Sequence, residues 1–146
     1  MAEVFAGFLC GFALALIATP FFALWMLQSR EAIPFIKNAV PEGMSILMIS
    51  VPVSSFFFLI WTMIGIVLGM VLVAAQNASP RGGFGSYNIL YTVIVVLLAF
   101  IIFFPPFVLV RSARRLTAGV ALSFLLLFGW ATPYLAHLAS IRWAQG

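Results

Sequence analysis

Charged side chains are almost missing from this sequence. Asp, Glu, Lys and Arg make up 7% of its 146 residues, whereas 65% of the residues are apolar. A soluble domain is typically about 25% charged and about 45–50% apolar. The mean hydropathy is +1.23, and a water-soluble chain of this size could not bury so much apolar surface in one core. The sequence therefore predicts an integral membrane protein.

Cysteine and histidine each occur once. Cys10 lies inside an apolar stretch and has no second cysteine with which to form an intramolecular disulfide. One histidine cannot form a bis-histidine haem site or a metal cluster within a single chain. His137 could still supply one axial nitrogen to a chlorophyll-type pigment or a haem. The alternative is an interfacial histidine that hydrogen-bonds to backbone or water.

Acidic residues are also scarce, which leaves a net charge of +4 and a pI near 10.0. The few basic residues flank apolar segments and do not form a stripe. Basic residues in that position orient membrane proteins and contact anionic lipid head groups. Nucleic acid is therefore excluded as an expected partner.

Long apolar runs are abundant. About 20 apolar residues suffice for a helix to cross the hydrocarbon layer, and four runs reach that length. They predict an all-α bundle of four transmembrane helices with short loops, in a single domain covering 1–146. The expected helices are 4–27, 53–75 with a lead-in 44–51, 89–110 and 116–139. Kinks are expected at the prolines within or beside these helices, namely Pro20, Pro52, Pro105, Pro106 and Pro133.

The first two apolar runs differ from the others in their flanking charge or in their length. The first carries Glu3 and no basic residue before it, which is unlike a secretory signal, so we expect it to stay in the mature protein. The second, 44–76, is too long for one perpendicular span. Pro52 is expected to divide it into an interfacial or kinked lead-in and a membrane helix. One long, strongly tilted helix is the alternative.

The distribution of basic residues predicts the orientation. Five of the seven lie in the two loops that four spans would place on the same side: Arg30, Lys37, Arg111, Arg114 and Arg115. Because cytoplasmic loops are enriched in Lys and Arg, we expect these loops in the cytoplasm and both termini outside. A bacterial inner membrane is the expected location. The same five residues are candidates for binding lipid head groups.

Small residues recur at four-residue spacing, as helices that pack closely in lipid require. The candidate packing or interface positions are Gly7, Gly11 and Ala15 in the first helix, Gly65 and Gly69 in the second, and Gly119 and Ser123 in the fourth. They could pack within this bundle or form a face for a partner or another copy. The third helix has only Ala99 as a small residue between Leu90 and Phe104, so we expect that helix to face lipid or a hydrophobic cofactor.

The four membrane cores lack Asp, Glu, Lys and Arg. Proton-coupled and ion-coupled transporters usually need such a group near the midplane, and no hydroxyl has an expected general base nearby. We therefore expect no enzyme but a small non-catalytic accessory subunit of a respiratory, photosynthetic or transport complex. Its expected partners are other membrane subunits and lipid, and tightly bound lipid is the expected cofactor, although the sequence requires none. The alternatives are a homo-oligomeric channel or carrier for a neutral or lipidic substrate, and a pigment or haem carrier that uses His137.

Overall fold

A computed structural model describes residues 1–28, 46–78 and 88–146, so Arg30 and Lys37 lie outside the described residues. The helices are α1 (Ala2–Gln28), α3 (Ile46–Ala78), α4 (Ile89–Leu109), α5 (Arg114–Leu126) and α6 (Thr132–Gln145). A 3-10 turn, Arg111–Ala113, joins α4 to α5, and a π-helical turn, Leu127–Ala131, joins α5 to α6.

The all-helical fold is confirmed, and four stretches are long and apolar enough to span a membrane: Ala2–Met26, Ser50–Ala78, Ile89–Leu109 and Arg111–Gln145. Helix α4 is helical although it is rich in Val and Ile, residues that favour strands in water. A lone segment in lipid must satisfy its own backbone polar groups, which favours the helix. At 21 residues, α4 is about 31 Å long, close to the thickness of the hydrocarbon layer.

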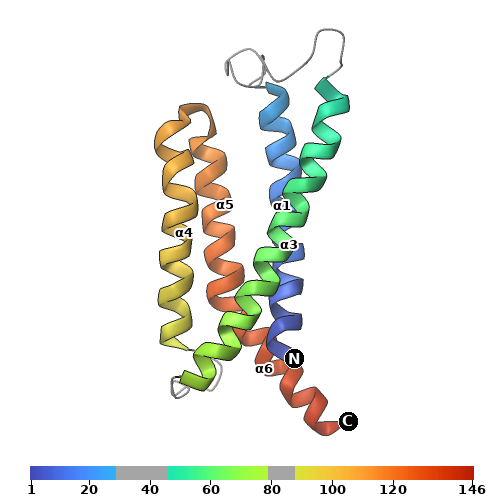
Figure 1. Cartoon of the computed structure of the whole chain (residues 1–146), viewed down its shortest axis with the longest axis vertical. Helices are drawn as coiled ribbons and strands as arrows, with labels where there is room; N and C mark the ends of the chain where they lie inside the picture. The colour runs from blue at the N-terminus through green and yellow to red at the C-terminus, as the bar shows by residue number, and fades with distance from the viewer. Residues whose placement is uncertain (29–45, 79–87) are drawn as a thin grey trace.

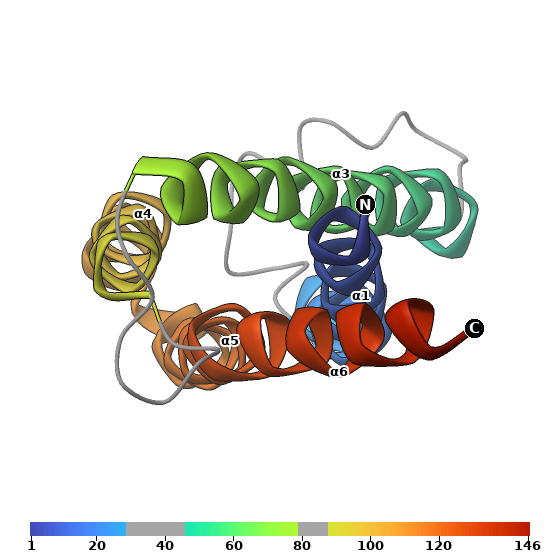
Figure 2. The ribbon, with the colours of Figure 1, turned by 90° about the horizontal axis from the view of Figure 1, so that it is seen from below.

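The helices form two pairs (Figure 1). Helix α1 crosses α3 closely, and α4 lies beside α5. The pairs approach each other at the end that holds the N-terminus, the start of α4 and α6, and they separate toward the turn between α4 and α5. Seen from below, α1 lies between α3 and α6 (Figure 2). We call the end with the α4–α5 turn the arginine end, because Arg111, Arg114 and Arg115 lie there.

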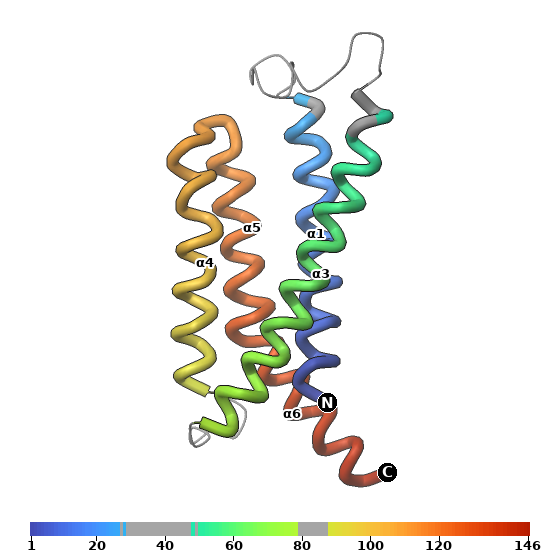
Figure 3. The backbone as a smooth tube through the Cα atoms, in the orientation of Figure 1, coloured from blue at the N-terminus to red at the C-terminus, as the bar shows by residue number. Residues whose placement is uncertain are grey.

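Helix α3 continues without a break through Pro52, from Ile46 to Ala78. The expected interfacial or kinked lead-in covered 44–51, of which 44 and 45 lie outside the described residues; from Ile46 onward it belongs to the same helix as 53–75. At 33 residues this helix is about 50 Å long, and it runs obliquely across α1 (Figure 3). A helix of this length exceeds the thickness of a hydrocarbon layer, which is about 30 Å. Kinks at the prolines stay a prediction.

The last apolar run differs from the single helix expected over 116–139. It bends at the π-helical turn, after which α6 runs away from the axis of α5 (Figures 1 and 3). Both the backbone N–H and the Oγ1 of Thr132 donate to the carbonyl of Leu127. Pro133 follows directly, and a proline both lacks a donor and crowds the carbonyl four residues earlier. A π-helical turn is one way for a helix to bend at such a point.

The core is aromatic and is centred on Trp61 of α3. Its ring stacks on Phe103 of α4, with ring centres 5.7 Å apart, and meets Phe124 of α5 edge-on at 6.0 Å. Phe57 packs edge-on against the same ring at 5.8 Å. Each such pair contributes about 0.5–1.5 kcal/mol beyond the area it buries. Trp61 therefore joins the two helix pairs.

Candidate functional site

Four glycines lie at the crossing of α1 and α3. A Cβ added to Gly11 would lie 2.8 Å from the Cα of Gly65, and one added to Gly69 would lie 2.7 Å from the Cα of Val4. Gly7 and Gly65 approach even more closely, because the carbonyl oxygen of each is the first atom that a Cβ on the other would meet. The structure thus brings these four predicted packing residues together, and backbone contacts backbone.

Ala15 continues this row on α1 and is fully buried. The glycines of α3 are in contact with α1 inside the chain, so they do not line an open passage. The channel alternative requires a polar lining, and three hydroxyls of the spans give it little support. Ser55, Thr62 and Ser123 each donate to a carbonyl one turn earlier in their own helix.

An apolar cavity of about 280 Å³ lies between the helix pairs toward the arginine end, and we call it the central cavity. Trp61 and Phe57 of α3 line it together with Trp25 of α1, Phe103 of α4 and Thr117 of α5. The indole Nε1 atoms of Trp25 and Trp61 are buried, and within the described part of the chain neither has a hydrogen-bond partner. Among the residues that the structure describes, the lining carries no charged side chain, so the cavity suits a neutral, largely apolar molecule.

Two further apolar clefts flank α4 on the outer surface. The cleft between α3 and α4 has a volume of about 450 Å³ and includes Met63 and Leu98. The cleft between α4 and α5 has a volume of about 360 Å³ and includes Phe100 and Phe104, whose rings stack 4.8 Å apart. Ala99, the small residue of this helix, is buried and also lines the cleft between α4 and α5. We call α4 with these two clefts the α4 face.

The three arginines at the arginine end, Arg111, Arg114 and Arg115, are not equivalent. The Nε of Arg114 donates to the carbonyl of Phe107 at 3.1 Å, and its guanidinium lies 5.6 Å from the centre of the Phe107 ring. Arg111 and Arg115 are exposed. Arg115 forms no hydrogen bond or ion pair with any residue that the structure describes. Arg114 is therefore held against the protein, whereas Arg115 is unpaired within the described ranges.

Gly119 and Ser123 line a fourth cleft, between α1 and α5, with a volume of about 230 Å³. We call it the α1–α5 cleft. Unlike the glycines at the crossing, Gly119 has no neighbouring atom within 4 Å of the position that an added Cβ would take. The same small-residue spacing thus has two outcomes, a filled contact at the α1–α3 crossing and an open cleft on α5.

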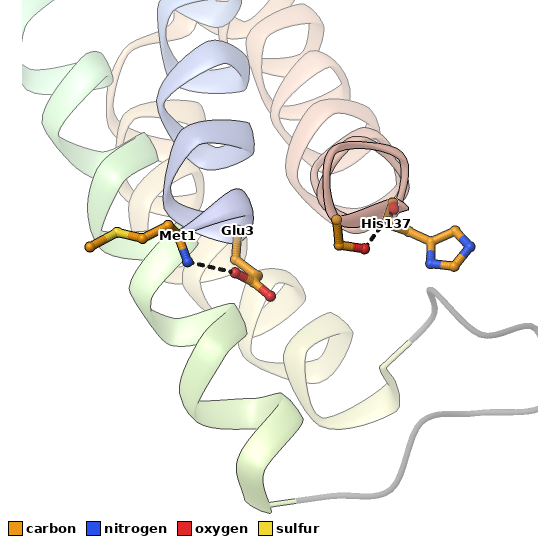
Figure 4. Close-up of polar contacts among 4 residues, drawn as sticks. Met1, Glu3 and His137 are labelled. Carbon is orange, nitrogen blue, oxygen red and sulfur yellow. Dashed lines mark hydrogen bonds and ion pairs between the residues drawn. The ribbon is translucent and has the colours of Figure 1, made fainter. Parts of the chain in front are cut away.

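His137 lies on α6 near the N-terminus of the chain. Its imidazole points away from Met1 and Glu3, which form an ion pair with each other at 3.2 Å (Figure 4). Its carbonyl accepts a hydrogen bond of 2.7 Å from Ser140. Over residues 1–28, 46–78 and 88–146, no three His, Cys, Asp or Glu side chains gather as metal ligands would.

Sequence reasoning overlooked Asn88. Its Oδ1 accepts from the backbone N–H of Tyr91 at 3.0 Å and caps the start of α4, while its Nδ2 donates to the carbonyl of Ala75 in α3 at 3.1 Å. The side chain is buried, so one residue both begins α4 and ties it to α3. An asparagine directly before an apolar run is a known signal for a helix start. The bond across to α3 had no signal in the sequence.

Comparisons of the chain with models of protein families, with curated proteins and with solved structures find no match.

Proposed function

We propose that this protein is a small non-catalytic subunit of a larger membrane complex, and that the α4 face is where its partner docks. The observation that carries the proposal is the shape of that face. Helix α4 forms a ridge between two apolar clefts of about 450 and 360 Å³. Helices in membranes pack by fitting the ridges of one into the grooves of another, so a partner helix would find a groove on either side of α4.

The outward side chains of α4 are large and apolar. Phe100 is 62% exposed and Ile101 is 66% exposed, and both lie near the middle of a helix that spans 89–109. Lipid accepts such side chains as readily as a partner does, so exposure alone would not support an interface. The concave clefts add that support, because a helix that only faces lipid has no need of them.

The membrane orientation belongs to the same proposal. We propose that the arginine end faces the cytoplasm and that both termini lie outside. The support is that Arg111, Arg114 and Arg115 gather beside one end of the bundle. At the opposite end, the described charged groups are the N-terminus, Glu3 and Arg142. A bacterial inner membrane remains the proposed location.

A carrier for a neutral or lipidic substrate is the second candidate, and the central cavity favours it. Its volume of about 280 Å³ and apolar lining could hold part of such a molecule. Pigment or haem carriage has weaker support, since His137 offers one nitrogen and no second ligand among the described residues. Replacing His137 with Leu would bleach an associated absorption band if that third function were right.

The test is purification from native membranes in a gentle detergent, followed by mass spectrometry of the co-migrating proteins. A photo-crosslinking residue at Phe100 probes the α4 face, and the same residue at Leu16, exposed on α1 outside the clefts, is the matched control. Under the proposal, larger membrane subunits co-purify stoichiometrically and crosslink from position 100 but not from position 16. A chain that purifies without other proteins and crosslinks only to itself would instead favour the carrier, and uptake into liposomes would then be measured.

A further inference from the structure

We propose that the α1–α5 cleft binds one anionic phospholipid, with its phosphate at Arg115 and one acyl chain running past Gly119 toward Ser123. The α1–α5 cleft is a different surface from the α4 face, and lipid binding there does not depend on whether the protein is a subunit of a complex.

The cleft has the form of an acyl-chain groove. Ile17 and Phe21 of α1 make one wall, and α5 makes the other. From Arg115 to Ser123 the α5 wall covers roughly 12 Å along the helix axis. Gly119 lies midway, and nothing stands within 4 Å of where its Cβ would be. The cleft thus runs from a charged residue at the arginine end into the apolar span.

The charge at the mouth of the cleft selects an anion. Arg115 has no acidic partner in the described part of the chain, where the one ion pair joins Met1 to Glu3 at the other end of the bundle. Arg114 is held by Phe107, so Arg115 is the cation that lines the cleft. It lies in the first turn of α5. Phosphate is the anion that a membrane surface supplies at this depth, and guanidinium binds it with paired hydrogen bonds.

A second copy of this chain fits the cleft less well. Two copies in the same membrane orientation, related by a two-fold axis along the membrane normal, would bring Arg115 opposite Arg115 if each docked on this surface. Two like charges brought together in this way repel each other, which opposes association of the two copies. An anionic lipid meets the same surface with the complementary charge.

The experiment compares phosphatidylglycerol with phosphatidylcholine of identical chains. The purified full-length protein is titrated with each lipid in detergent, and native mass spectrometry counts the lipids retained and the copies of the chain. Two variants separate the parts of the site. Arg115→Gln removes the charge, and Gly119→Leu fills the groove without changing charge. Gly129→Leu is the matched control, because Gly129 also has no atom within 4 Å of a Cβ and does not line the cleft.

The wild type is expected to retain one phosphatidylglycerol in preference to phosphatidylcholine. Arg115→Gln should lower the affinity for phosphatidylglycerol about fivefold, the effect of one basic group near an anionic lipid, and should leave phosphatidylcholine unchanged. Gly119→Leu should abolish retention of the lipid, while Gly129→Leu should bind as the wild type does. Equal binding by Gly119→Leu and Gly129→Leu would overturn the proposal. So would a wild-type dimer that Gly119→Leu converts to a monomer, because the cleft would then hold a second copy.

Discussion

Replacing Gly65 with Ala should destabilise the bundle, because the crossing of α1 and α3 has no room for one methyl group. The added Cβ would lie 2.7 Å from the Cα of Gly11 and would also meet the carbonyl oxygen of Gly7. Carbon atoms in contact are normally about 3.5–4.0 Å apart. The opposing atoms are backbone, which cannot rotate away, so the two helices must separate by about 1 Å. Overpacking of this kind costs about 1–3 kcal/mol.

The matched control is Gly119→Ala. Its Cβ would meet nothing within 4 Å, so the substitution changes only the intrinsic helix preference. Alanine is about 0.8–1.0 kcal/mol more favourable than glycine in a helix interior. The free energy of unfolding should therefore fall for Gly65→Ala and stay unchanged or rise by up to that amount for Gly119→Ala.

Reversible unfolding in mixed micelles, followed by tryptophan fluorescence, measures both changes. Trp61 is a suitable reporter because it lies in the contact between α3, α4 and α5. If the two variants unfold at the same denaturant concentration, the claim that the α1–α3 crossing has no room for a methyl group is wrong. A second variant, Gly69→Ala, gives an independent check, since its Cβ would lie 2.7 Å from the Cα of Val4.

Two further substitutions address polar contacts and are measured in the same unfolding assay. Asn88→Ala should lower the free energy of unfolding by about 1–3 kcal/mol, because it leaves the N–H of Tyr91 and the carbonyl of Ala75 without their present partner; an unchanged midpoint would contradict the capping role. Thr132→Val removes a side-chain hydrogen bond in the π-helical turn and should cost about 0.6 kcal/mol, the average for such bonds in membrane helices. Ser123→Ala is its control, because the Ser123 hydroxyl bonds within its own exposed helix turn and its removal should not measurably change the free energy of unfolding. Equal losses of unfolding free energy in both variants would refute a stabilising role for the Thr132 hydroxyl in the π-helical turn.

Several features of the fold could be predicted from local sequence. The length of each apolar run and the absence of charge within it predicted four helices that can span a membrane, because backbone in lipid must satisfy its own hydrogen bonds. The spacing of Gly7, Gly11, Gly65 and Gly69 marked positions where a helix can be approached closely. These inferences need only a continuous stretch of the sequence and no contact between distant residues.

Other features depend on residues that are distant in the sequence. Pro52 was expected to divide the second run, but α3 continues through it, because a tilted helix can lie across α1 along its length. A kink was expected at Pro133, but the sequence showed no sign of the π-helical turn, Leu127–Ala131, that precedes this proline. In neither case does the local pattern fix the outcome.

The sequence by itself determined that this protein has helices long and apolar enough to span a membrane, since the length of an apolar run and its lack of charge are properties of the chain alone. Only the tertiary structure decided what each small residue does. Gly65 and Gly119 belong to the same kind of pattern, yet one is pressed against the backbone of α1 and the other opens into a cleft. The physical reason is that a glycine permits close approach but does not supply the partner. Whether another helix fills the space depends on how the two helix pairs lie in three dimensions.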